Sequence, residues 1–446
     1  MESILKWLFA VAILLPAMAV HAAGDVPRPR QISVADGLPS NHVSDIVEDA
    51  QGFLWIATSD GLARYDGTGF RVWQIEDGLP DSYLWALDID SSGRIWLGTT
   101  LAGLVCFDPR AGSFLGAAGL GVPELEGEQV WAVAVDDRDR VWFGTASSGL
   151  YRRDPDGGIE RFMPVEGDPR SLPSPAVSVV EVAPDGAIWV GTRGGAARWT
   201  GRDFERLADD ALPDGRVNSI VFEADGSAWI GTARGVALRR PDGTLAGHGW
   251  DAKDNTRVID VLGRDSRGDY WLDIPAGLGF AAGPDGPVSV LSLYSESSRG
   301  EVRPYWTGAL EDQEGGVWLR SNSHALWYVP ASWRRFAIHV RRVGDPETVG
   351  NARVIAIAPA AGGGVWLVGS SGVLDRFDPA TGAVQRVMED VGQGLVLRGV
   401  LQDRRGNVWV GYTSGLARLD PRTGAIRRWG VDDEHDAIPV PMSVGG

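Results

Sequence analysis

One tryptophan recurs along the chain at a nearly constant interval, and this periodicity limits the possible folds more than any other feature. Nine of the 19 tryptophans occupy the same place in a repeated segment, 40 to 48 residues apart. The first copy reads DAQGFLWIATSDGLARYD and the second DSSGRIWLGTTLAGLVCFD. The full set is Trp55, Trp96, Trp142, Trp189, Trp229, Trp271, Trp318, Trp366 and Trp409. A repeat of this length favours an architecture in which similar units pack against their neighbours.

Each unit divides into four short strands separated by tight turns. In the first unit VSDIVED alternates as a strand should, AQG is a turn, FLWIAT a second strand and SDG a second turn. LARYD and FRVWQI follow as third and fourth strands before a DGLP loop. Glycine and aspartate suit such turns because they tolerate positive φ and accept local hydrogen bonds. Four antiparallel strands at this period describe one blade of a β-propeller, so we predict an all-β fold with the tryptophans packed between blades.

Nine units allow two arrangements. We expect a seven-bladed β-propeller over residues 23–340, followed by two blades of an incomplete second propeller over residues 341–446; the alternative is a single nine-bladed ring. The segment RQISVADGLP near the N-terminus is similar to RVWQIEDGLP, a fourth strand and its loop. We therefore expect it to complete the outer edge of a closing blade. WRRFAI, from Trp333 to Ile338, is a second candidate for that edge, and the sequence does not decide between them.

The first 22 residues are typical of a secretory signal peptide. Lys6 precedes an apolar run from Trp7 to Val20, and small residues follow. The run is shorter than the roughly 20 residues that a membrane-spanning helix needs, and no later segment could span a membrane. We predict a periplasmic protein, with an uncleaved inner-membrane anchor as the alternative. Cys106 is the only cysteine, so no internal disulfide can form, and we expect it to be a buried apolar residue.

The segment from Ala35 to Gly67, ADGLPSNHVSDIVEDAQGFLWIATSDGLARYDG, resembles the first repeat of the two-component regulator propeller family. The resemblance implies the periplasmic sensor portion of a hybrid histidine kinase or of a propeller-containing diguanylate cyclase. It is weaker in units six to eight: WLDIPAGLGF and WLRSNSHALWYV replace the usual W-φ-G-T-x-x-G-L pattern, where φ is apolar. No kinase or cyclase motif is present. We expect a sensor without transmembrane and output domains.

In such a fold the first strand of each blade lines a central channel, and ligands bind across its mouth. Residues at strand starts and in the loops between second and third strands would form this site. We predict as ligand-binding residues Tyr83, Trp131, Arg193, Arg216, Arg234, Arg257, Tyr305 and Arg353. Further candidates are Asn41, His42, Trp85, Asn218, Trp306, Asp60, Asn322 and His324. Arginines and aromatic rings favour a small anionic or carbohydrate ligand. The alternative is that the arginines only pair with nearby acidic residues on a solvated rim.

Composition excludes several other functions. The formal net charge of −17, with dispersed acidic residues, argues against nucleic acid as a partner. Repeated acids such as Asp49, Asp90 and Asp403 lie in separate blades, so we predict no metal site. We predict no cofactor, no catalytic residue and no enzyme activity, because the histidines are scattered and no nucleophile motif occurs. Two alternatives stay open: an exported propeller scaffold that binds a periplasmic protein, and a propeller lyase or hydrolase. Ligand identity and oligomeric state are not determined by the sequence.

Overall fold

The computed structural model describes residues 27, 29–207, 212–247, 259–284, 286–291, 293–295, 300–333, 348–391 and 394–430. The chain splits into two compact units. We call Val26–Trp333 the ring unit, and we call the described residues 348–430 the two-sheet unit. The predicted signal peptide and the predicted boundary between residues 340 and 341 lie outside the described residues.

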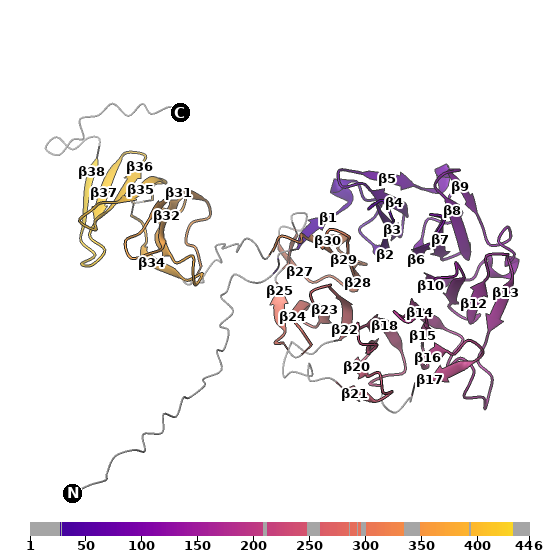
Figure 1. Ribbon diagram of the computed structural model, residues 1–446. Coiled ribbons are helices and arrows are strands. Elements are labelled where there is room, and N and C mark those ends of the chain that lie inside the picture. The colour runs from indigo at the N-terminus through magenta and orange to yellow at the C-terminus, as the bar shows by residue number, and fades with distance from the viewer. Residues whose placement is uncertain are drawn as a thin grey trace, which may run out of the picture. The chain divides into compact units, whose positions relative to one another are not determined.

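The described part of the ring unit contains seven four-stranded antiparallel sheets arranged around a central channel (Figure 1). The first three are β2–β5 (Val43–Glu48, Leu54–Thr58, Gly61–Tyr65, Phe70–Trp73), β6–β9 (Leu84–Ile89, Ile95–Thr99, Leu104–Asp108, Ser113–Leu115) and β10–β13 (Val130–Val135, Val141–Thr145, Leu150–Arg153, Ile159–Phe162). The next three are β14–β17 (Val177–Val182, Ile188–Thr192, Gly195–Trp199, Phe204–Arg206), β18–β21 (Val217–Phe222, Ala228–Thr232, Gly235–Arg239, Leu245–Gly247) and β22–β25 (Asp260–Arg264, Asp269–Ile274, Gly277–Ala282, Ser289–Leu291). The all-β propeller prediction is confirmed.

The seventh sheet joins the two ends of the ring unit. Its order is β1-β30-β29-β28, with bounds Arg30–Ile32, Leu326–Val329, Val317–Ser321 and Trp306–Glu311. β1 pairs antiparallel with β30, Gln31 opposite Trp327. The N-terminal strand therefore completes the outer edge of the closing blade, as the sequence predicted. Because the ring closes here, the nine-bladed alternative is not what the structure shows. Most of the competing segment, from residue 334 onward, lies outside the described residues.

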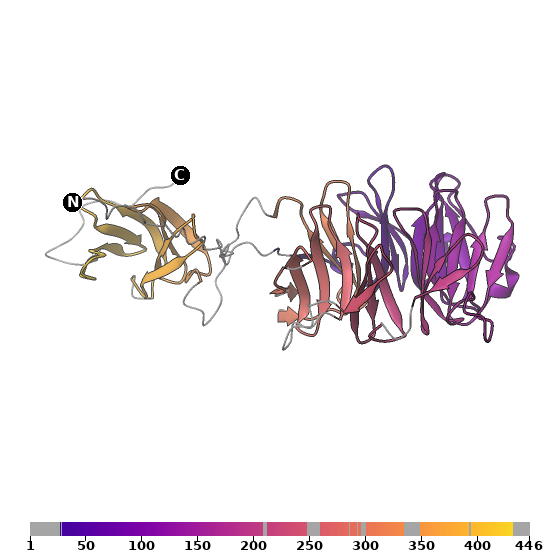
Figure 2. The same ribbon diagram turned by 60° about the horizontal axis from the view of Figure 1, so that its bottom comes forward.

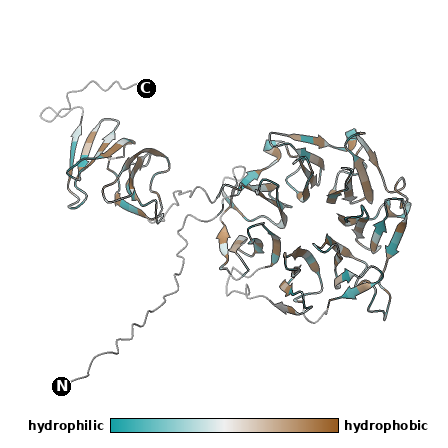
Figure 3. Ribbon diagram, viewed as in Figure 1, coloured by the Kyte–Doolittle hydropathy of each residue, from teal (hydrophilic) through white to brown (hydrophobic). Residues whose placement is uncertain are grey.

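Smaller elements lie between the sheets of the ring unit. Three 3₁₀ helices, η1 (Val34–Asp36), η2 (Ile75–Asp77) and η3 (Pro123–Leu125), lie in the loops that lead to inner strands. A hairpin of β26 (Leu293–Ser295) and β27 (Gly300–Val302) precedes β28. Figure 2 shows the strands running from one face of the ring to the other. Hydrophobic stretches follow these strands, and hydrophilic residues gather in turns and on outer strands such as β13 (Figure 3).

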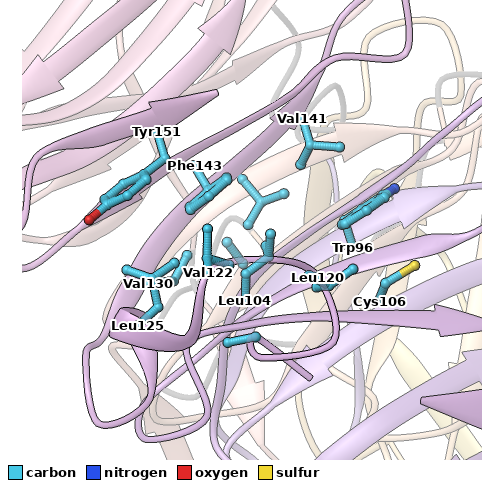
Figure 4. Close-up of a cluster of buried hydrophobic side chains, with 13 residues drawn as sticks. Trp96, Leu104, Cys106, Leu120, Val122, Leu125, Val130, Val141, Phe143 and Tyr151 are labelled. Atoms are coloured by element: carbon cyan, nitrogen blue, oxygen red, sulfur yellow. The ribbon is translucent and has the colours of Figure 1, made fainter. Parts of the chain in front are cut away.

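The repeated tryptophan makes two contacts. Its indole Nε1–H donates to a carboxylate in the preceding turn, as in the pairs Trp55–Asp49 (2.9 Å), Trp96–Asp90 (3.0 Å) and Trp142–Asp136 (2.8 Å). Its ring packs against the next sheet. Figure 4 shows Trp96 and the buried Cys106 beside Val130, Val141, Phe143 and Tyr151 of the following blade. The expected burial of Cys106 is confirmed. A tryptophan that makes both contacts fixes its own hairpin and the neighbouring blade at once.

The glycine two residues after the tryptophan marks a close approach between blades. A Cβ atom built at these glycines would lie 2.5 or 2.6 Å from the first valine of the next inner strand. The pairs are Gly98 with Val130, Gly144 with Val177 and Gly191 with Val217. Real Cβ atoms do not come this close to other atoms, so a larger residue would push the blades apart. The W-φ-G-T pattern therefore encodes contacts within a blade and contacts between blades.

The two-sheet unit repeats the same blade twice. Its sheets are β31–β34 (Val354–Pro359, Val365–Gly369, Leu374–Phe377, Val384–Met388) and β35–β38 (Leu397–Gln402, Val408–Tyr412, Gly415–Leu419, Ile426–Gly430). Trp366 of the first sheet packs on Val408 and Val410 of the second, as the ring tryptophans do on their neighbours. Trp409, in the second sheet, is only half-buried.

Substitution of Trp142 by alanine should destabilise the ring unit by about 3–5 kcal/mol, the usual effect of removing a large buried side chain. The matched substitution Trp409→Ala should cost less, because this ring is already partly exposed. Urea unfolding followed by circular dichroism measures both. Equal losses would show that packing between blades does not control the stability of the fold.

Candidate ligand-binding site at the channel mouth

The inner strands enclose a cavity of about 700 Å³ along the axis of the ring unit. Its walls come from β2, β6, β10, β14, β18, β22 and β28, which Figure 1 shows around the centre. This volume lies within the range of about 300–1,000 Å³ that small-molecule sites occupy in proteins. The cavity is therefore large enough to hold a ligand of a few sugar units.

A recurring backbone hydrogen bond builds the mouth of this cavity. In each pair the residue after the second strand donates its N–H to the carbonyl of the residue just before the inner strand. The pairs are Ser59–His42, Thr100–Tyr83, Ala146–Gln129, Arg193–Ala176, Ala233–Arg216 and Asn322–Tyr305, with distances of 3.0 to 3.2 Å. Of the predicted site residues, Tyr83, Arg193, Arg216 and Tyr305 therefore lie at the same end of the strands.

Three aromatic side chains from two neighbouring blades form what we call the aromatic arc: Tyr83, Trp85 and Trp131. The centroids of Tyr83 and Trp85 are 4.8 Å apart, and the Tyr83 hydroxyl lies 3.2 Å from Nε2 of His42. Trp85 Nε1 donates to Thr100 Oγ1 at 2.9 Å, which fixes the ring at the cavity wall. Burial lowers the pKa of His42, which favours the neutral imidazole.

Arg193 extends this arc onto the fourth blade. Its guanidinium carbon lies 4.6 Å from the ring centroid of Trp131, a cation–π contact. Trp131 is itself held by a hydrogen bond from Nε1 to Gln129 Oε1 at 2.9 Å. Arg193 remains exposed, so the stacked guanidinium can still bind an acidic group of a ligand. The structure therefore pairs Tyr83 with Trp85 and Trp131 with Arg193 on three neighbouring blades, and both Trp85 and Trp131 line the cavity.

The remaining predicted residues are placed differently. Arg216 and Tyr305 are exposed at the mouth, outside the arc. Arg234 forms an ion pair with Asp214 at 3.4 Å, as the alternative of a solvated rim expected. Arg257 lies outside the described residues, and Arg353 belongs to the two-sheet unit. Placing Trp306 at the mouth was wrong, because its side chain is buried between blades with Trp271 and Val317.

Below the mouth, polar side chains tie several inner strands to the next one. Asp45 accepts from the backbone N–H of Leu87 at 3.0 Å, and Asp88 accepts from that of Val135 at 2.7 Å. Ser178 donates to the carbonyl of Val217 at 2.8 Å. Burial raises the pKa of Asp88 to about 6. These side chains hold the channel wall together and leave it rich in hydrogen-bond acceptors.

Glu181 occupies the same strand position as Asp88, two blades further on. Its carboxylate has no hydrogen-bond or ion-pair partner among the described residues, and it faces the water of the channel. The protein that surrounds it on all sides, together with the charge of Asp88, raises the pKa of Glu181 to about 8. At neutral pH Glu181 is therefore mostly protonated, and its carboxyl group can both donate a hydrogen bond to a ligand and accept one.

Sequence reasoning missed two charged residues, each of which replaces the glycine of the W-φ-G-T pattern. Asp273 follows Trp271 at this position, and Arg320 follows Trp318. Asp273 lies opposite Asp260, and burial raises the pKa of both to about 7. Arg320 forms an ion pair with Asp45 at the channel wall. The departures from the pattern in WLDIPAGLGF and WLRSNSHALWYV were the signal that could have revealed them.

Comparison with known proteins agrees with this fold. Residues 37–60 match the family described as two component regulator propeller. Two similar solved structures are extracellular domains of hybrid two-component systems from B. thetaiotaomicron. Their TM-scores are 0.66 and 0.56 at 18% and 19% identity; 92% and 90% of this chain align with 55% and 53% of theirs. The chain thus spans about half the length of these structures.

A third similar structure is virginiamycin B lyase from Staphylococcus aureus. Its TM-score is 0.53 at 14% identity, covering 68% of this chain and 99% of the lyase. At these identities the similarities show a shared propeller fold. No curated protein sequence matches the chain. Within the described residues, no helix is long and apolar enough to cross a membrane.

Replacing Glu181 by glutamine should change how stability depends on pH. A carboxyl group with a higher pKa in the folded chain binds more protons when folded, so the free energy of unfolding falls as pH rises between the two pKa values. For Glu181 this interval runs from 4.5 to about 8. The Glu181→Gln variant should therefore gain stability relative to the wild type across this interval.

Urea unfolding at several pH values measures this difference, and Glu166→Gln on an exposed loop is the control. Comparison with the wild type cancels the titration of carboxyl groups that do not interact with Glu181, which leaves Glu181 and its neighbour Asp88. A difference that does not change with pH would contradict the assigned environment of Glu181.

Proposed function

We propose that this chain is the ligand-binding part of an exported bacterial sensor and that it recognises a carbohydrate carrying an acidic group. The observation that carries the proposal is the aromatic arc with Arg193 at its end, over a cavity of about 700 Å³. The family match at residues 37–60 and the fold shared with extracellular domains of two-component systems support a sensory role in the periplasm.

Aromatic rings and a guanidinium suit two different parts of such a ligand. The apolar face of a sugar ring packs on an aromatic side chain, and Trp85 lines the cavity with its ring held at the wall. One face of Trp131 is covered by Arg193, so this pair offers a positive charge at the rim. A carboxylate or sulfate on the sugar would accept two parallel hydrogen bonds from the guanidinium.

The channel wall favours hydroxyl groups over bare anions. Asp88 and Glu181 present carboxyl groups to the cavity, and Ser178 and Asn218 add further polar groups. Sugar hydroxyl groups can exchange hydrogen bonds with these groups, whereas a small inorganic anion inside the channel would be repelled by the Asp88 carboxylate. We therefore place the acidic group at the rim and the hydroxyl-rich part in the channel.

A second function, docking of a periplasmic protein, is supported by exposed apolar side chains. Leu101, in the loop after β7, and Tyr305, before β28, are both exposed at the mouth face. Protein interfaces are enriched in such residues. The glycan-binding experiment described next also distinguishes protein docking and lyase activity from carbohydrate binding.

Screening the purified chain against an array of neutral and acidic glycans should reveal binding to acidic glycans. Trp131→Ala and Arg193→Ala should each lower affinity at least about tenfold, since a stacked ring and a charge-assisted hydrogen bond each contribute roughly 1.5 kcal/mol or more. Arg161→Ala is the matched control, because Arg161 lies 5.4 Å over Tyr151 on the outer strand β13, away from the channel. Titration calorimetry measures the affinities.

Three results would contradict the proposal. If both variants bind the glycan with unchanged affinity, the glycan does not bind at the aromatic arc. Capture of a periplasmic protein, lost on Leu101→Asp and without glycan binding, would favour the scaffold. Shortening of a bound glycan, or opening of a macrocyclic substrate, would favour a lyase.

A further inference from the structure

Arg320 is a basic side chain in the wall of the channel, at a position where the first five blades have glycine or alanine. Since those blades form the same four-stranded sheets, the fold does not require an arginine at this position. Two arginines line the cavity, and the other one, Arg264, forms an ion pair with Glu223 at 2.9 Å. The role of Arg320 therefore lies in the chemistry of the channel.

The Arg320 guanidinium lies at what we call the seam, where β28 of the closing blade runs beside β2 of the first blade. It packs on Gly308 of β28, where a Cβ atom would overlap it. Its Nη1 forms an ion pair with Asp45 of β2. The Asp45 carboxylate also accepts from the backbone N–H groups of Ile46 and Leu87, at 2.9 and 3.0 Å. Asp45 therefore takes only some of the N–H donors of the guanidinium.

Two donors at the seam have no hydrogen-bond partner among the described residues: Arg320 Nε and Ser44 Oγ. Ser44 precedes Asp45 on β2 and lines the same cavity. A covered N–H or O–H group without an acceptor costs free energy, so both groups gain from an oxygen atom that a ligand brings. Burial lowers the pKa of Arg320 to about 10, so the side chain stays cationic at neutral pH. It is 23% exposed, so the guanidinium can turn toward the channel.

Small side chains leave room at the seam. The inner strands on either side of it carry Thr307 and Ser44 as their second residue. The next two blades carry Trp85 and Trp131 at the same position. Thr307 Oγ1 already donates to the carbonyl of Val43, at 3.1 Å. A sugar ring that packs on a tryptophan can thus place a substituent at the seam, where Ser44 and the guanidinium still have free donors.

We propose that Arg320 and Ser44 form a subsite for the carbonyl oxygen of an acylamino group on the ligand. This inference rests on the proposed function, because it names a further group on the acidic carbohydrate. A carbonyl oxygen has lone pairs and no proton, so it accepts from an Arg320 N–H and from the Ser44 hydroxyl at once. A second carboxylate suits the seam less well, because Asp45 already neutralises Arg320 and Asp88 adds a negative charge to the channel wall.

An array of acidic glycans tests this specificity. It contains matched pairs that differ in one substituent, for example glucuronate linked to N-acetylglucosamine and glucuronate linked through the same bond to glucose. The purified chain should bind the acylamino member of such a pair at least about tenfold more tightly, because a hydrogen bond from a charged donor contributes this much. Titration calorimetry then measures the ratio of the two affinities.

Arg320→Gln should remove this preference by lowering the affinity for the acylamino glycan about tenfold, with little effect on its hydroxyl counterpart. The substitution also leaves the Asp45 carboxylate without its ion pair, but this affects both members of a pair equally and cancels in the ratio. Ser44→Ala keeps the ion pair and should lower the same ratio, so it tests the subsite even if Arg320→Gln does not fold. Arg71→Gln is the matched control, because Arg71 lies 4.6 Å over Trp73 on the outer strand β5.

The outcomes separate this subsite from the proposed function. Equal binding of both members of every pair by the wild type would overturn the subsite and leave acidic-glycan recognition intact. An affinity ratio that survives both Arg320→Gln and Ser44→Ala would do the same. If no acidic glycan binds, the proposed function fails, and the subsite fails with it.

Discussion

The packing of one tryptophan per blade between adjacent sheets is the interaction on which the rest of the structure depends. In most blades the indole is anchored by a carboxylate of its own turn, as in Trp142 and Asp136, and its flat ring covers the next blade. The two contacts couple local hairpin geometry to the angle between blades. Because each blade is stabilised by contacts with its neighbours, a blade at the open end of an unclosed ring lacks part of its stabilisation.

This uniform framework leaves function to the positions that depart from it. Where the repeat has glycine after the tryptophan, Arg320 reaches the channel and pairs with Asp45 of the first blade. The absence of a side chain at Gly308, whose φ is +152°, leaves room for that guanidinium. Trp85 and Trp131 likewise stand where other blades have serine, asparagine or threonine. The recurring residues thus determine the fold, and the residues that depart from the repeat determine the chemistry of the channel.

The same distinction explains how far sequence reasoning could go. The strands, the buried tryptophans and the closing role of β1 follow from periodicity and turn chemistry, which are local properties. The charged channel wall does not, because Asp273 and Arg320 matter through contacts with neighbouring strands. Trp306 was misplaced because it takes the strand-start position at which Val43 and Val130 are buried, and there it packs on the preceding blade with Trp271.

Closure by β1 has a consequence for how the ring forms. Gln31 of β1 pairs with Trp327 of β30. The first strand to be synthesised therefore pairs with a strand that follows nearly three hundred residues later in the chain. Loop-closure entropy grows only slowly with length, but contacts of such long range slow folding. During synthesis the early blades must persist with an open side. Folding of the ring is therefore expected to be limited by its last step, in which a three-residue strand converts a row of blades into a closed and cooperative whole.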